Sequence, residues 1–180
     1  MRIHSGTSLV VLAALTIGVT TLASAQSKHD SNAPIDFAAT HQELDDRAQR
    51  VILTGDVVIT QAEMTLKAAR VNVAFSGSAL SGSPEATRVD AVGGVVMSRP
   101  DQRARSDYAI YDVKARTVTM LGNVNLVQGN NNVSGGRLTL DLDTGRATVD
   151  GGAVGGSLPG TTTGSNGRVT GHFQVPKRDN

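Results

Sequence analysis

Residues 117–150 alternate apolar and polar side chains around a single turn, and this alternation restricts the chain to β-structure more strongly than any other feature. A period of two places alternate side chains on opposite faces of a strand, so one face should be apolar and the other polar. Gly122 falls on the apolar parity, and a glycine there favours a bulge or a sharp bend. The stretch predicts short antiparallel strands that bend around an apolar interior. The alternate positions that carry apolar side chains are Val118, Met120, Val124 and Leu126 before the turn and Leu138, Leu140 and Leu142 after it.

The same pattern recurs along the chain. Residues 51–61 repeat the first strand, and residues 66–73 match residues 133–140 in strand character, so a whole unit recurs and not one strand alone. The glycines that take the corresponding position are Gly55, Gly93, Gly122 and Gly151. We therefore expect a single all-β domain, with strands near residues 49–61, 87–98, 104–112, 116–128 and 137–150. The abundance of Val, Thr and Gly disfavours long helices in this part of the chain.

Residues 1–25 have the pattern of a secretory signal peptide. Arg2 supplies a positive start, residues 9–22 form an apolar run, and Ala23-Ser24-Ala25 fits the small-x-small cleavage rule. The alternative, an uncleaved membrane anchor, is weaker because the run is shorter than the about 20 residues that a membrane span needs. Cleavage predicts a protein exported to the periplasm or a similar space. The chain has no Cys, so it must be stable without disulfides.

The remaining segments follow from composition. Residues 26–33 are polar and predict a flexible N-terminus, whereas an alternating strand should begin at residues 34–38 and residues 43–47 should end a strand and turn. Residues 76–84 and 155–167 are rich in Gly, Ser and Thr and indicate loops. Residues 168–175 alternate again, and residues 176–180 form a charged tail. The expected domain spans residues 34–175.

Several classes of function are disfavoured. The net charge of +1 offers no attraction for nucleic acid, and an aromatic content of 3% is low for a surface that stacks bases or sugars. The chain has no Cys nucleophile, no Gly-x-Ser-x-Gly motif and no converging pair of carboxylates, so we expect neither an enzyme nor a cofactor. The four histidines have no metal-ligand spacing and should lie on the surface: His4, His29, His41 and His172.

One short stretch has the opening spacing of a calcium loop. Asp141, Asp143 and Gly145 fit its first positions, but the twelfth position is Gly152, where a bidentate Glu is needed. The favoured interpretation is a hairpin turn with Gly145 at positive φ.

Four motifs resemble the OstA-like domain family of lipopolysaccharide transport. They are Leu44-Asp45-Asp46, residues 53–61, residues 121–126 and residues 138–147. The resemblance runs from about Pro34 to Asp150, and residues 168–176 are similar to the closing strand of the family. It implies a twisted, V-shaped β-jelly roll of antiparallel strands whose interior groove holds lipid A acyl chains. A cleavable signal without an outer-membrane barrel resembles the soluble periplasmic member of the family.

The resemblance also implies partners. Copies of such a protein stack head to tail as a homo-oligomer between an inner-membrane ABC-transporter complex with an LptC-like protein and an outer-membrane LptD-like protein. An ATPase at the inner membrane would supply the energy, because this chain has no nucleotide motif. The rival interpretation is a structural or adhesive β-solenoid of the cell envelope, for which Thr, Gly and Asn richness is ordinary. The unequal spacing of the bend glycines argues against a solenoid.

Two sets of residues form the expected lipid groove. Parity selects Val57, Ile59, Met97, Val124, Leu126, Leu138 and Leu140, and the resemblance adds Ile35, Tyr111 and Val113 at positions that face the lipid. A closed core would use the same residue types, so this alternative remains open at the sequence level. Because an open jelly roll leaves edge strands unpaired, residues 35–39 and 168–175 should offer edges for another copy.

Overall fold

The structure is a computed structural model that describes residues 29–80, 82, 84–151 and 167–174. In these ranges the chain forms one antiparallel sheet of ten strands, which confirms the all-β prediction. No helix within the described ranges is long and apolar enough for a membrane span. The strands are β1 (Ile35–Ala38), β2 (His41–Asp45), β3 (Arg50–Gln61), β4 (Met64–Ser76), β5 (Glu85–Arg99), β6 (Gln102–Asp112), β7 (Thr117–Gln128), β8 (Asn131–Asp141), β9 (Ala147–Asp150) and β10 (Thr170–His172).

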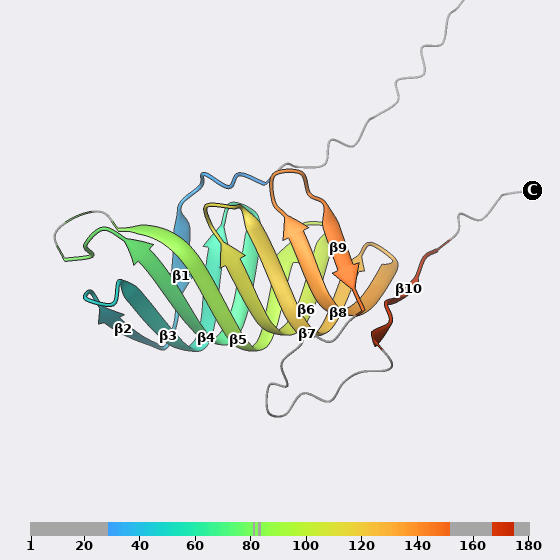
Figure 1. Ribbon diagram of the computed structural model, residues 1–180, viewed down its shortest axis with the longest axis horizontal. Coiled ribbons are helices and arrows are strands. Elements are labelled where there is room, and N and C mark those ends of the chain that lie inside the picture. Colours follow the sequence, from blue (N-terminus) through green and yellow to red (C-terminus); the bar gives the residue numbers. More distant parts are fainter. Residues whose placement is uncertain (1–28, 81, 83, 152–166, 175–180) are drawn as a thin grey trace, which may run out of the picture.

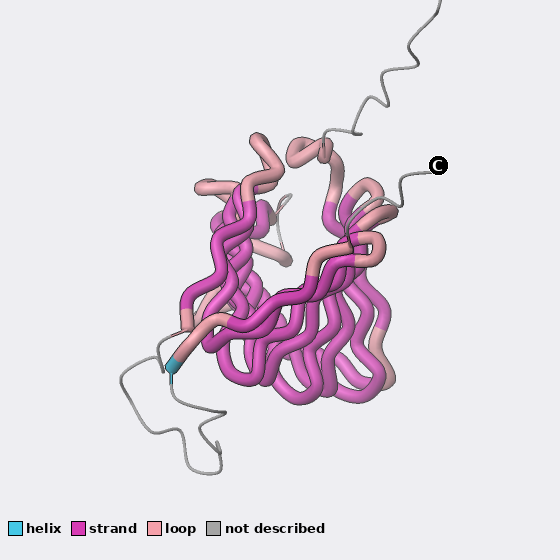
Figure 2. Tube along the Cα trace, turned by 90° about the vertical axis from the view of Figure 1, so that its right-hand side faces the viewer, coloured by secondary structure: helices cyan, strands magenta, loops and turns pink. Residues whose placement is uncertain are grey.

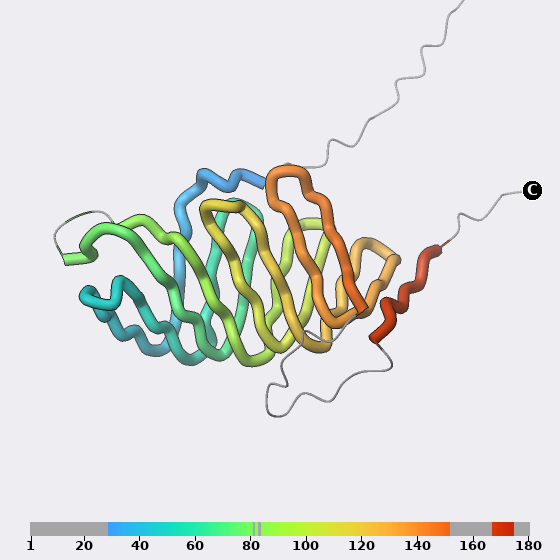
Figure 3. Tube along the Cα trace, in the orientation of Figure 1, coloured from blue at the N-terminus to red at the C-terminus, as the bar shows by residue number. Residues whose placement is uncertain are grey.

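The six long strands, β3 to β8, pair in chain order and form the body of the sheet (Figure 1). Both ends of the sheet carry two short strands, because β1 and β2 pair with successive parts of β3 while β9 and β10 pair with successive parts of β8. Figure 3 shows the chain winding from its N-terminal edge to its C-terminal edge along the long axis. The sheet stays open, with two distinct edges.

Three glycines bend the sheet. Gly55, Gly93 and Gly122 have φ of 79°, 89° and 75°, and the strand register shifts at each of them. The residue that follows each glycine also has a positive φ. These residues are Asp56, Gly94 and Asn123, and Asp, Gly and Asn adopt positive φ more readily than most residue types. The bends predicted from these glycines are confirmed. Gly151 lies after the end of β9, so its prediction as a fourth bend is wrong.

The bends divide the sheet into two walls that meet as a V, visible at the bottom of Figure 2. The first wall contains β1, β10 and the segments of β3 to β8 nearest the turns at residues 62–63, 100–101 and 129–130. The second wall contains β2, β9 and the segments nearest the turns at residues 46–49, 77–80, 113–116 and 142–146. The turns of the first wall form one rim of the V, the first rim, and the turns of the second wall form the other, the second rim.

The structure corrects two of the expectations about strands. Residues 137–150 form parts of two strands, because β8 ends at Asp141 and β9 starts at Ala147. The turn between them contains Gly145 at φ 70°, as the hairpin interpretation predicted. β4 was absent from the expected strands, although residues 66–73 had strand character. Residues 43–47 end a strand and enter a turn as predicted, because β2 ends at Asp45 and the turn begins at Asp46.

The outer face of the second wall carries an ion-pair cluster. The Arg88 guanidinium donates to both carboxylate oxygens of Asp90 at 2.8–3.0 Å, and the Tyr108 hydroxyl donates to Asp90 Oδ1 at 2.8 Å. Burial acts to raise the pKa of Asp90, but these hydrogen bonds outweigh it and hold that pKa below its ordinary value. The cluster links β5 to β6 on the side away from the apolar interior.

Candidate functional site

The ten predicted groove residues all belong to the interior of the V. Eight are buried side chains of the central apolar cluster: Val57, Ile59, Met97, Tyr111, Val124, Leu126, Leu138 and Leu140. Ile35 and Val113 are partly buried and pack against that cluster. The period-two alternation therefore identified the inner face of β3, β5, β7 and β8, and the resemblance added Ile35, Tyr111 and Val113.

The interior is continuous along the row of strands. In the first wall, Ile59 pairs with Leu66, Leu66 with Met97, and Met97 with Ala104, so one row of inward side chains crosses β3 to β6. Ala104 then pairs with Leu126, which extends the row to β7. A matching row crosses the second wall through Val73, Val89, Tyr111, Val118 and Leu140. Two rows of side chains that are aliphatic apart from Met97 and Tyr111 thus line the two walls along the length of the V.

Side chains of the protein fill this interior. Leu53, Met97 and Met120 are all 0% exposed, and a buried alanine occupies the inner face at positions 91, 104 and 109. A long apolar guest therefore requires the two walls to move apart or the side chains to rearrange, because close-packed interiors leave little free volume. Leu53, Val118 and Met120 have the parity of the predicted residues and could have been found from the sequence.

A buried glutamine interrupts the apolar interior. Gln61, at the end of β3, is 2% exposed and continues the parity of Val57 and Ile59. Its Oε1 accepts a 2.7 Å hydrogen bond from the hydroxyl of Tyr111, which comes from the opposite wall. Burial raises the pKa of the Tyr111 phenol, and the hydrogen bond with Gln61 only partly offsets this. The phenol therefore remains a protonated donor at neutral pH. The sequence analysis did not identify Gln61.

The segment before β1 packs against the same glutamine. Gln61 Nε2 donates to the carbonyl oxygens of Ser31 and Ala33 at 3.1 and 3.0 Å. His29 is 3% exposed, and its ring nitrogens lie 3.2 Å from Glu63 Oε1 and 3.4 Å from Gln61 Oε1. The prediction of a surface position for His29 is wrong, since these contacts hold it inside the first rim. His41 and His172 are exposed, and His4 lies outside the described residues.

The acidic turn at residues 141–145 has a structural role in the hairpin. Asp141 Oδ1 accepts hydrogen bonds from the amides of Thr144 at 2.9 Å and Asp143 at 3.0 Å. The bonds from Thr144, its backbone amide first, hold the pKa of Asp141 below its ordinary value. Within the part of the chain that the structure covers, no group of three or more His, Cys, Asp or Glu side chains could hold a metal ion.

Both edges of the sheet expose apolar side chains. Phe37 on β1 and Leu44 on β2 are 48% and 40% exposed, and Val169 and Phe173 beside β10 are 43% and 67% exposed. The N-terminal edge was predicted at residues 35–39, and β1 lies there with β2 beside it on β3. At the C-terminal end the edge includes β9 as well as β10, so the prediction of residues 168–175 alone was incomplete. Val175, the tail at residues 176–180 and most of the predicted loop at residues 155–167 lie outside the described residues.

Bent antiparallel strands around one continuous aliphatic interior define an open β-jelly roll. A family model described as the LptA/(LptD N-terminal domain) LPS transport protein matches residues 37–146. The chain therefore belongs to this family of lipopolysaccharide (LPS) transport proteins. The resemblance inferred from the sequence motifs is thereby confirmed.

Two known proteins are similar to this chain over most of its length. An uncharacterized protein of Rhizobium meliloti (strain 1021) is 29% identical over 167 residues, which cover 87% of this chain and 89% of that protein. The crystal structure of LptH, the LptA-homologous periplasmic component of the lipopolysaccharide transport device of Pseudomonas aeruginosa, superposes with a TM-score of 0.68. It shares 23% identity and covers 82% of this chain and 99% of LptH. The predicted V-shaped jelly-roll fold is confirmed by this likeness.

Proposed function

We propose that this protein carries lipopolysaccharide through the periplasm with the lipid A acyl chains held inside the V. The observation that carries the proposal is the continuous aliphatic interior, built from one face of all six long strands. An acyl chain of about a dozen methylenes exposed to water costs on the order of 10 kcal/mol, at about 0.8 kcal/mol for each methylene. An aliphatic groove removes this cost without specific hydrogen bonds. Membership in the lipopolysaccharide transport family supports the same function.

In this proposal the ten interior residues predicted from the sequence contact the acyl chains after the walls have separated. The sugar and phosphate groups of lipopolysaccharide stay at the rims, because burying charged groups without partners is costly. The open sheet suits this arrangement, since neither edge closes the groove against the next molecule. Carriage of this kind needs no catalytic groups, in keeping with a family of transport proteins.

The proposed setting is a bridge between two membranes. Copies of the chain stack head to tail from an inner-membrane ABC-transporter complex with an LptC-like protein to an outer-membrane LptD-like protein. Export by the signal at residues 1–25, which lie outside the described residues, brings the chain to the periplasm. The alternative of an adhesive β-solenoid is not favoured, because consecutive strands pair antiparallel through hairpins instead of forming coils.

Photo-crosslinking tests where lipopolysaccharide binds. A photoreactive amino acid at Met97 or Tyr111, one from each wall, is expected to form a covalent adduct with lipopolysaccharide. The same residue at Asn125 is expected to form none, because the Asn125 side chain lies on the outer face and contacts Asn132 and Ser134. Adducts are detected on gels with an antibody to lipopolysaccharide. Equal labelling at all three positions would contradict binding in the interior.

The head-to-tail assembly predicts a complementation between two edge variants. Phe37→Asp places a charge on the N-terminal edge and Phe173→Asp places one on the C-terminal edge, so neither variant alone should form oligomers on chemical crosslinking. A mixture should form dimers, because the first variant keeps its C-terminal edge and the second keeps its N-terminal edge. If each copy used the same edge on both sides of the interface, one of the two variants would form dimers by itself and mixing would add none, which would contradict the head-to-tail contact.

A further inference from the structure

A single buried glutamine joins three parts of the molecule. Gln61 belongs to the first wall, its Oε1 accepts the Tyr111 hydroxyl of the second wall, and its Nε2 holds Ser31 and Ala33 of the N-terminal segment. The Nε2 group has two hydrogens and both are used, while Oε1 also lies 3.4 Å from His29 Nε2. The hydrogen-bonding capacity of this side chain is thus fully occupied by contacts that span the V.

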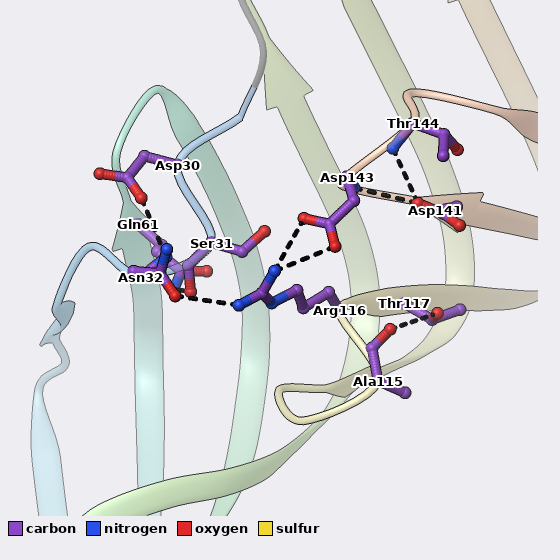
Figure 4. A network of polar contacts seen from close by, with 10 residues as sticks. All are labelled: Asp30, Ser31, Asn32, Gln61, Ala115, Arg116, Thr117, Asp141, Asp143 and Thr144. Atoms are coloured by element: carbon purple, nitrogen blue, oxygen red, sulfur yellow. Dashed lines mark hydrogen bonds and ion pairs between the residues drawn. The ribbon is translucent and has the colours of Figure 1, made fainter.

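The N-terminal segment is also attached to the second wall. Arg116, at the turn between β6 and β7, donates from Nη2 to Asn32 Oδ1 at 3.0 Å and from Nη1 to Asp143 Oδ2 at 3.0 Å (Figure 4). Residues 29–33 are therefore bound to Gln61 on one side and to Arg116 on the other. Figure 1 shows this blue segment running over the open side of the V before β1 begins.

We propose that residues 29–33 and the Gln61–Tyr111 hydrogen bond form a clasp that closes the V over its interior and opens to admit acyl chains. The inference rests on the proposed function and names the element that controls uptake. The hydrogen bond joins the two walls near their rims, since Gln61 ends β3 and Tyr111 lies one residue before the end of β6, so an acyl chain cannot enter from the open side at this point while both partners stay joined. The segment bound to both walls must also release at least one of them before the walls separate.

Two buried polar atoms near the clasp favour its release. Ser31 Oγ, in the segment itself, and Arg99 Nε, beside Glu63, are buried without a hydrogen-bond partner. An unpaired buried polar group is unfavourable, and exposure to water relieves it. Lifting the segment breaks its hydrogen bonds with Gln61 and Arg116, and in return it lets water hydrate Ser31 Oγ and Arg99 Nε.

A covalent lock tests the clasp directly. The chain has no cysteine, so Asn32→Cys with Asp143→Cys introduces the sole thiol pair, and a short bismaleimide can join the segment to the second rim. The probe is lipopolysaccharide labelled with a fluorophore on its sugar, and the readout is the rate of anisotropy increase. Uptake by the locked protein is expected to slow by about tenfold or more, as for a gate that cannot open.

The matched control is the pair Thr119→Cys and Thr139→Cys, which lie opposite each other in β7 and β8 on the outer face. Joining them with the same reagent should leave uptake unchanged. A second variant works in the opposite direction, since Tyr111→Phe keeps the ring and removes the hydroxyl that bridges the walls. Its uptake should be faster by about fivefold, the factor that corresponds to a net hydrogen bond of about 1 kcal/mol.

The outcomes separate the clasp from the function on which it rests. If the unmodified protein binds lipopolysaccharide and the locked form takes it up at the same rate, the clasp is wrong and the proposed function stands. If no form binds lipopolysaccharide, the proposed function fails and the clasp fails with it. Thermal melting of each variant is measured in parallel, and the lock remains decisive if Tyr111→Phe does not fold.

Discussion

Replacing Gly93 with alanine is expected to lower the free energy of unfolding by about 3 kcal/mol, which is large for the addition of one methyl group. Gly93 has a φ of 89°, where an L-residue pays about 1–2 kcal/mol of backbone strain. A Cβ at this position would also lie 2.8 Å from the Cβ of Ala69 on β4, so the backbone of the bend must shift. Urea unfolding followed by circular dichroism measures the loss.

Its neighbour Gly94 provides the control. Gly94 has a φ of 60°, but a Cβ there would meet nothing within 4 Å, so Gly94→Ala should cost only the backbone strain of about 1–2 kcal/mol. Combining Gly93→Ala with Ala69→Gly removes the contact and should recover the difference between the two single variants. If Gly93→Ala and Gly94→Ala lowered the free energy of unfolding equally, the close approach of Gly93 to β4 would not be the reason that the bend requires glycine.

Replacing Met97 with aspartate is expected to unfold the protein or to cost about 4 kcal/mol or more, since it buries an unpaired charge. Met97 is 0% exposed and its side chain lies inside the first wall. The adjacent Val96 faces outward and pairs with Lys67 on β4 and Arg105 on β6. Val96→Asp should therefore be neutral or stabilise the fold by about 0.2–1 kcal/mol through cross-strand attraction.

The two aspartate variants differ by one position along the same strand, so they compare the two faces with little change in composition. Thermal melts at neutral pH give the comparison, and added salt should reduce any gain from Val96→Asp because exposed charge pairs are screened. Similar melting temperatures for both variants would contradict the assignment of inner and outer faces.

Much of the sheet could be predicted from the local sequence pattern, because successive side chains of any strand point to opposite faces. Met97 and Val96 illustrate this, as adjacent residues with opposite environments that the alternation had separated. The bends at Gly55, Gly93 and Gly122 were predictable for a similar reason, since glycine on an apolar parity leaves a gap that a strand seldom tolerates. Gly151 has the same sequence context but follows the last residue of β9, and it lacks the positive φ of the three bend glycines.

The contacts of the N-terminal segment could not be predicted, because they depend on residues far apart in the sequence. Nothing near His29 or Ser31 indicates that Gln61 and Arg116 hold the segment from two walls. Gln61 shares the parity of Val57 and Ile59, but a glutamine at a strand end is ordinarily exposed. Its buried position follows from the fold, which brings the Tyr111 hydroxyl and two backbone carbonyls within hydrogen-bonding distance.

The most direct test of lipid carriage uses the methionine methyl groups. Every methionine in the described residues lies in the interior: Met64, Met97 and Met120 are each at most 1% exposed. With methyl-labelled methionine in the protein, nuclear Overhauser effects report which methyl groups lie within a few ångströms of the bound lipid. Carriage inside the V predicts effects between acyl methylenes of lipopolysaccharide and the methyl groups of Met97 and Met120, which lie on opposite walls. Binding of lipopolysaccharide that leaves all three methyl resonances unshifted and without such effects would contradict it.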